Sequence, residues 1–112
     1  MAYEVYSAVD LYAGQPAIAL TDLVTLKQKT ILKSIVIHNT TASGAKLKLY
    51  VIRPGKTANA ETQRIGTSIG GEDTIKFSFE TVLPKGTIIA ASQTVSGALS
   101  IDISGVEVIP GV

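Results

Sequence analysis

The chain has 112 residues, a formal net charge of +1 and no cysteine. This length predicts one domain, the near-neutral charge gives no electrostatic footprint for DNA or an anionic membrane, and the lack of cysteine excludes disulfides and thiolate metal sites. Charged residues make up only 17% of the chain and hydrophobic residues 46%, whereas soluble domains carry roughly 25% charged residues. This composition predicts a folded chain that covers part of its surface with copies of itself or with a partner.

Residues 1–16 differ from the rest because they hold three of the four tyrosines: Tyr3, Tyr6 and Tyr12. The segment ends in Gly-Gln-Pro, which is a turn signal. Tyrosine side chains bury a large area at a low cost in conformational entropy, which suits an interface. Two alternatives stay open for this segment: an edge strand, or an N-terminal arm that packs on a neighbouring subunit. We expect residues 17–112 to form a β-sandwich domain.

The strongest strand signal lies at residues 30–39 (TILKSIVIHN). Strict alternation places Ile31, Ile35 and Ile37 on one face and Leu32 and Val36 on the other. A strand that is apolar on both faces is central in its sheet or is covered by another subunit. We therefore expect the three isoleucines to contact a partner, together with the three tyrosines.

The rest of the chain alternates between short strands and turns. A turn at residues 39–44 (NTTASG) joins the strand at 30–39 to an alternating strand at 45–53, and we expect these two strands to form an antiparallel hairpin. Gly105 interrupts the final strand, which indicates a β-bulge. The other strands are predicted at residues 17–26, 62–69, 74–80, 87–92 and 98–108.

About seven to nine short strands with turn signals every 8–12 residues are typical of an all-β sandwich or barrel. The sequence therefore predicts an antiparallel β-sandwich with jelly-roll-like organisation. The apolar runs are much shorter than the about 20 residues of a membrane span, so we expect no membrane association. The segment MAYEVYSAVD has neither a basic nor an apolar region of the signal-peptide type, so we expect no signal peptide.

No motif indicates catalysis, a cofactor or a metal. Residues 55–57 (GKT) resemble the end of a phosphate-binding loop, but position 50 is Tyr50 where that motif requires glycine. His38 has no serine and acid placed beside it in the sequence. Glu72 and Asp73 are too few for calcium, which takes six to eight oxygen ligands. We therefore predict that the chain is not an enzyme and has no catalytic, cofactor-binding or metal-binding residues.

Two kinds of ligand remain to be considered, single-stranded nucleic acid and a glycan or receptor. Lys33, Lys46, Lys48 and Tyr50 would form a basic, aromatic face for single-stranded nucleic acid if they shared one sheet face. One tyrosine is a small stacking platform, so we expect a solvated face and no nucleic-acid partner. A glycan- or receptor-binding sandwich is an alternative, although aromatic residues make up only 5% of the chain and tryptophan is absent.

The segment ILKSIVIHNTTASGAKLKLYVIRPG (31–55) resembles a segment common in small virion proteins of tailed bacteriophages. VLPKGTIIAASQ (82–93) and ALSIDISGVEV (98–108) are similar to later segments of the same proteins. The resemblance covers residues 30–109 and rests on strand and turn positions, and residues 1–29 match less well. It implies a non-enzymatic antiparallel sandwich, often oligomeric, on the head, neck or tail of a virion. It supplies no catalytic residue.

These observations lead us to expect a structural protein of a tailed-bacteriophage virion. We favour a capsid decoration (cement) protein that stabilises the particle through contacts between subunits. The alternatives are a tail, collar or fibre accessory protein and the glycan- or receptor-binding module. The expected partners are other copies of the chain, in a homo-oligomer such as a trimer, and other virion proteins such as the major capsid protein. The expected location is the virion, after synthesis in the host cytoplasm.

Overall fold

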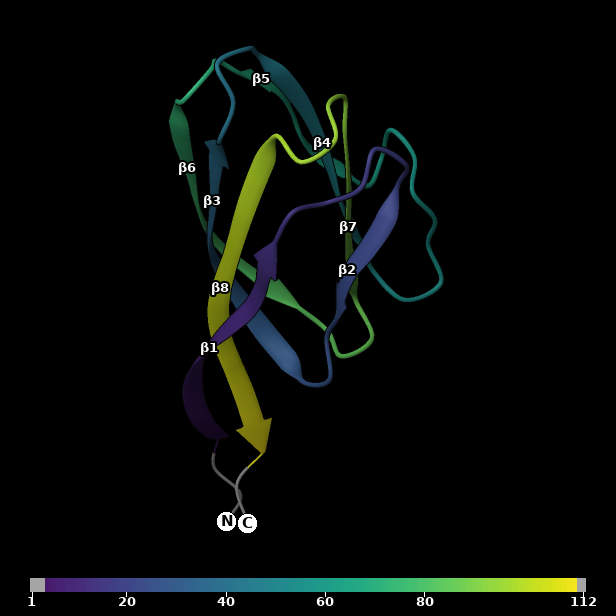
Figure 1. Cartoon of the computed structure of the whole chain (residues 1–112). Coiled ribbons are helices and arrows are strands. Elements are labelled where there is room, and N and C mark those ends of the chain that lie inside the picture. Colours follow the sequence, from purple (N-terminus) through teal and green to yellow (C-terminus); the bar gives the residue numbers. More distant parts are fainter. Residues whose placement is uncertain (1–3, 111–112) are drawn as a thin grey trace.

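The computed structural model describes residues 4–110, which form eight β-strands in two four-stranded antiparallel sheets (Figure 1). The first sheet has the order β1-β8-β3-β6, with β1 at Glu4–Gly14, β8 at Leu99–Pro110, β3 at Lys29–Asn39 and β6 at Thr74–Leu83. The second sheet has the order β2-β7-β4-β5, with β2 at Thr21–Thr25, β7 at Ile88–Gln93, β4 at Ala45–Ile52 and β5 at Gln63–Ile69. None of the described residues belongs to a helix of the length and apolarity needed to cross a membrane.

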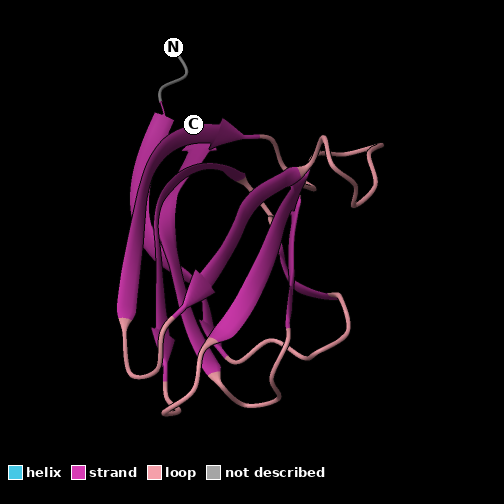
Figure 2. Ribbon diagram, turned by 90° about the horizontal axis from the view of Figure 1, so that it is seen from above, coloured by secondary structure: helices cyan, strands magenta, loops and turns pink. Residues whose placement is uncertain are grey.

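The chain changes sheet at every connection except the one between β4 and β5. This path produces the strand order of an eight-stranded jelly roll, in which two sheets face each other. The predicted antiparallel β-sandwich is therefore confirmed. Figure 2 shows from above how the two sheets curve around a shared interior.

The two sheets enclose a core of apolar side chains that alternate along their strands. In β4, Leu47 and Leu49 point inward while Lys46 and Lys48 are exposed, as the alternating sequence predicts. In β6, Ile75, Phe77 and Phe79 are half-buried and pack against the same core. Side chains with at most 1% exposure include Leu32, Ile35, Ile37, Leu47, Leu49, Ile101 and Ile103.

The predicted hairpin between residues 30–39 and 45–53 is wrong. β3 pairs with β8 and β6 in the first sheet, whereas β4 pairs with β5 and β7 in the second. The turn between them carries the chain across the sandwich, and the Thr40 amide donates to the Ala98 carbonyl oxygen at 2.7 Å. Turn residues determine the local bend, but which sheet the next strand joins depends on contacts far away in the sequence.

Residues 4–14 form the edge strand β1, which pairs with β8 from Glu4 opposite Pro110 to Gly14 opposite Ile101. Of the two alternatives for residues 1–16, the described part adopts the edge strand and belongs to the same sandwich as the later residues. On the other side of β8, the ladder with β3 ends at Val108. The paired ends of β1 and β8 therefore extend beyond β3 as a two-stranded ribbon (Figure 1).

Two β-bulges lie beside Gly105 of β8. Leu11 has no partner in the ladder between β1 and β8, and Lys33 has none in the ladder between β3 and β8. The irregularity predicted at Gly105 is present at that level, but the extra residues belong to the two neighbouring strands. An extra residue changes the face on which the following side chains of its strand lie.

The bulge at Lys33 changes the face on which Ile31 lies. Leu32 takes the inward position together with Ile35 and Ile37, and Ile31 turns toward the outer face of the sheet. The predicted grouping of the three isoleucines on one face is therefore wrong. The physical reason is the side-chain period of two, because one inserted residue moves every earlier position to the opposite face.

Candidate interaction surface

The structure separates the six residues expected to contact a partner. Ile35 and Ile37 are 0% exposed and pack between the two sheets. Neither side chain can reach another subunit unless the sandwich opens, which corrects the expectation that they form a contact surface. Their burial follows from the central position of β3 between β8 and β6.

The tyrosines occupy different surroundings. Tyr6 is 62% exposed, whereas Tyr12 is half-buried and packs against the core. The bulge at Leu11 accounts for this difference, because it turns Tyr12 to the inner face while Tyr6 lies on the outer face. Tyr3 lies outside the described residues.

A row of apolar side chains crosses the outer face of the first sheet. Ala8 lies opposite Val106, Val106 lies opposite Ile31, and Ile31 lies opposite Val82. Directly opposed residues of antiparallel strands point to the same face and are in contact distance. Tyr6 lies two residues before Ala8 on the same face, and Val82 is 52% exposed. We call Tyr6, Ala8, Ile31, Val82 and Val106 the outer patch.

The outer patch continues onto the ribbon formed by the ends of β1 and β8. Val5 is 46% exposed on the other face of the ribbon and lies opposite Ile109. At the margin, Lys29 Nζ lies 3.7 Å from Glu4 Oε2. This end of the first sheet thus presents apolar side chains on both faces, with an exposed ion pair beside them.

The sequence pattern pointed to Tyr6 and Ile31 but missed Val82 and Val106. Both valines lie in alternating segments, TIKFSFETV and SGVEV, at positions where the alternation predicts an exposed polar residue. An apolar residue at a position predicted to be exposed, in each of two strands, was the signal that could have identified them. Their alignment into one row depends on the register of four strands, which the sequence does not state.

The rest of the outer face of the first sheet is mostly polar, and the half-buried Val36 between Lys76 and Asp102 is an apolar exception. Ser34 Oγ and Ser104 Oγ lie 2.6 Å apart, and His38 Nδ1 lies 2.7 Å from Thr74 Oγ1. The two serines are therefore paired with each other and His38 is paired with Thr74, so neither serine is hydrogen-bonded to the histidine. Across residues 4–110, no group of three His, Asp or Glu side chains gathers where it could hold a metal ion.

The residues considered for nucleic-acid binding lie on opposite sides of the sandwich. Lys33 is on the first sheet, where its Nζ lies 3.4 Å from Glu80 Oε1. Lys46, Lys48 and Tyr50 are on β4 in the second sheet. The shared basic face that this hypothesis required is therefore not formed.

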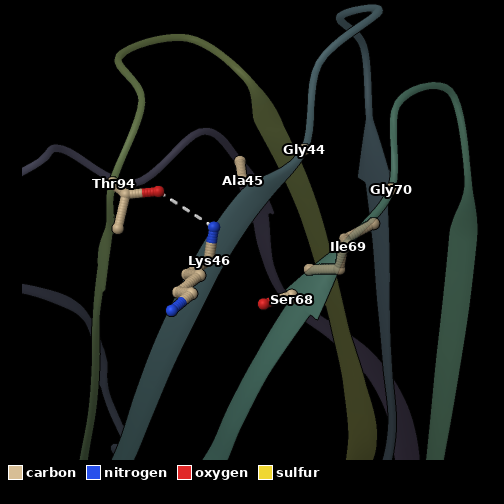
Figure 3. A pocket seen from close by; sticks show the side chains of 7 residues that line it. All are labelled: Gly44, Ala45, Lys46, Ser68, Ile69, Gly70 and Thr94. Atoms are coloured by element: carbon tan, nitrogen blue, oxygen red, sulfur yellow. Dashed lines mark hydrogen bonds between the residues drawn. The ribbon is translucent and has the colours of Figure 1, made fainter.

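An open depression of about 520 Å³ lies over the ends of β4 and β5 (Figure 3). The Lys46 amide donates to Thr94 Oγ1 at 2.9 Å at one side, and the Lys46 and Ser68 side chains lie on the same face of the strand pair. No aromatic side chain lines this depression, so it offers no stacking platform for a sugar ring. Its lining residues are Gly44, Ala45, Lys46, Ser68, Ile69, Gly70 and Thr94.

Comparison with known proteins relates the chain to others through its fold. No protein-family model matches the sequence, and no curated protein matches it. A chain in the crystal structure of the T13 IBDV viral particle is 14% identical, with a TM-score of 0.55 over 95% of this chain and 31% of that chain. A chain of infectious bursal disease virus Gx strain is 16% identical, with a TM-score of 0.45 over 97% of this chain and 32% of that one. The present chain spans about a third of the length of both, and the first match shows that its β-sandwich fold also occurs in a chain of a viral particle.

Proposed function

We propose that the chain is a non-enzymatic structural protein of a virion, and specifically a capsid decoration protein of a tailed bacteriophage. It acts by attaching to the particle and stabilising it through contacts between subunits. The outer patch is the observation that carries this proposal, since a solvated sheet face in a monomer is normally polar.

Two further observations support a virion protein. The fold resembles that of a chain from a viral particle, and residues 30–109 resemble small virion proteins of tailed bacteriophages. Jelly rolls also occur in lectins and cupins, and a fold by itself does not assign a function. The argument for adhesion therefore rests on the patch, and the resemblances select the kind of assembly.

The outer patch suits contact with another protein. Covering apolar surface contributes about 25 cal/mol per Å² before the costs of association are subtracted. A single small patch gives modest affinity, but a decoration protein repeats its contact over a symmetric shell, and avidity then raises the strength of attachment. Tyr6 and Ile31 are the members of the patch that the sequence also pointed to.

Deletion of the gene from its phage tests the proposal. We expect the resulting particles to lose their DNA at a lower temperature and to regain wild-type resistance when the purified protein is added back. Tyr6→Ser protein should restore resistance poorly, because it removes the most exposed large side chain of the patch. Ile18→Ser is the matched control, since Ile18 is 55% exposed and lies next to the second sheet.

Two further experiments separate the alternatives. Immunogold labelling of the head supports a decoration protein, whereas labelling of the tail or collar supports an accessory protein of those structures. Competable binding on a glycan array, with no effect of gene deletion on particle stability, would replace the structural role with the receptor-binding module.

A further inference from the structure

The exposed edge strand β6 has the features of a surface that pairs with a second copy of the chain. β6 is hydrogen-bonded to β3 on one side only, so its other edge is open in the described chain. It contains ten residues and neither glycine nor proline. Its side chains alternate between exposed and half-buried from Thr74 to Val82 without interruption. The ladder with β3 shifts register at Phe79 and Glu80, which have no partner in it, but the alternation of side chains continues through both residues. An open edge of this length is a template for another strand.

The other three edges are less suited to pairing. β2 has only five residues, and β5 contains Gly66 at its centre. β1 has a bulge at Leu11, as β6 has a register shift at Phe79 and Glu80, so charge is what distinguishes these two edges. The charged side chains of β1 are Glu4 and Asp10, which have the same sign. An antiparallel pair of β1 strands therefore brings no opposite charges together.

The backbone of β6 presents alternate peptide groups to the open edge. The Asn39 amide donates to the Asp73 carbonyl oxygen at 2.9 Å, where β3 meets the start of β6. In an antiparallel ladder every second residue faces the same neighbour. The peptide groups of Thr74, Lys76 and Ser78 consequently face away from β3 and are free to pair with another strand.

We propose that two copies of the chain associate through antiparallel pairing of their β6 strands around a two-fold axis at Ser78. In this register Ser78 lies opposite itself, and Lys76 lies opposite Glu80 of the second copy, so that two ion pairs form by symmetry. Each Glu80 carboxylate, 83% exposed, is then shared between Lys76 of the second copy and Lys33 of its own chain, whose Nζ lies 3.4 Å from Glu80 Oε1. The opposed charges stabilise the pair, and like charges in these positions would destabilise it. Moving the axis to Phe77 or Phe79 places both charges opposite uncharged residues.

Two sandwiches joined in this way share one continuous eight-stranded sheet. Phe77 of each copy lies opposite Phe79 of the other on the inner face, which gives an aromatic cross-strand pair on each side of the axis. A two-fold contact of this kind is isologous, so it closes and does not propagate into fibres. This inference builds on the proposed structural role by naming the surface through which copies pair, and its test in solution requires no virus particle.

Sedimentation equilibrium of charge-reversal variants tests the pairing. We expect the wild-type chain to form dimers, and Lys76→Glu and Glu80→Lys each to raise the dissociation constant about tenfold or more. The double variant Lys76→Glu/Glu80→Lys should bind more tightly than either single variant, because it restores opposite charges across the axis, although residue 80 no longer pairs with Lys33. Lys48→Glu, the same reversal on an exposed position of β4, is the matched control and should leave the dissociation constant unchanged.

A cysteine introduced at the axis gives a second measurement. Ser78→Cys is the only thiol in a chain without native cysteine, and directly opposed residues of a ladder lie within the range of a disulfide. Oxidation should crosslink this variant into covalent dimers, whereas Ser104→Cys on the interior strand β8 should form no covalent dimer.

A monomeric wild-type chain at all concentrations overturns the pairing, and so does a dimer that neither charge reversal weakens. In the second case the dissociation constant of Tyr6→Ser distinguishes the two proposals. Weakening by Tyr6→Ser alone keeps the outer patch as the contact and rejects β6.

Discussion

The carbonyl oxygen of Ile31 occupies the space that a side chain on Gly105 would need. A β-carbon built on Gly105 stands 2.6 Å from that oxygen and 3.3 Å from Leu11 Cδ1. Because β1 and β3 both bulge at this level, their atoms crowd around β8 from either side. Because Gly105 has no side chain, β1 and β3 can both bulge beside it. At this level of the sheet the side chains of both strands switch between the core and the outer face.

Gly105→Ala should therefore destabilise the sandwich by about 2 kcal/mol, because backbone atoms must move to admit the methyl group. Urea unfolding followed by circular dichroism measures this change. Gly44→Ala is the control: the nearest atom to its built β-carbon is the Ile69 carbonyl oxygen at 3.8 Å. Equal stability of Gly105→Ala and Gly44→Ala would show that the crowding at Gly105 is relieved at no cost.

Ile35 and Ile31 should respond differently to the same truncation. Ile35→Ala removes a fully buried side chain from the core and should cost about 3 kcal/mol of unfolding free energy. Ile31→Ala should cost about 1 kcal/mol or less, because the side chain is half-buried on the outer face, and should weaken attachment to other subunits instead. Urea unfolding measures the first effect, and binding to phage particles that lack the protein measures the second. A larger loss of stability at Ile31 would place this residue in the core.

The contrast between these isoleucines shows what the sequence could predict. The alternation in AKLKLYVI and TIKFSFE indicates strands with one buried face, and both strands exist as β4 and β6. The bulge at Lys33 has no local signal, because neither glycine nor proline accompanies it. This single extra residue is the reason that the face predicted for Ile31 was wrong.

The pairing of strands was less predictable than their positions. The segment NTTASG favours a turn, but it does not state whether the chain returns in the same sheet or crosses to the other. In the structure, the Asn39 amide donates to the Asp73 carbonyl oxygen and the Thr40 amide to that of Ala98. The Glu72 amide donates to the Thr41 carbonyl oxygen. The outer patch combines side chains from four strands, so it becomes visible only once their order and register are known.

Asn39 uses all of its hydrogen-bonding groups in the interior. Its Nδ2 donates to the carbonyl oxygens of Ser43 at 2.8 Å and of Ile69 at 3.0 Å. Its Oδ1 accepts from the Thr41 amide at 2.9 Å and from Thr41 Oγ1 at 2.8 Å. The side chain is 0% exposed and joins the crossover between the sheets to the end of β5.

Asn39→Asp should cost about 3 kcal/mol at neutral pH, because a carboxylate oxygen would then face two carbonyl oxygens in the interior. Thermal unfolding measures the loss. Asn59→Asp is the matched substitution on the surface, where Oδ1 accepts from the Glu61 amide at 2.8 Å and an aspartate keeps that bond. Unfolding temperatures that agree for the two variants would contradict the role assigned to Asn39.

Removal of residues 1–14 should abolish cooperative unfolding. The deletion takes away the whole of β1, exposes the edge of β8 along the register from Glu4 to Gly14, and withdraws Leu11 and Tyr12 from the core. The exposed strand edge should also promote aggregation. Thermal unfolding and size-exclusion chromatography measure both effects, and Tyr6→Ser is the control that changes the surface of β1 without removing the strand. If the truncated chain stays monomeric and melts as sharply as the full chain, β1 contributes little to the sandwich, and the alternative of an arm for contact with a neighbouring subunit gains support.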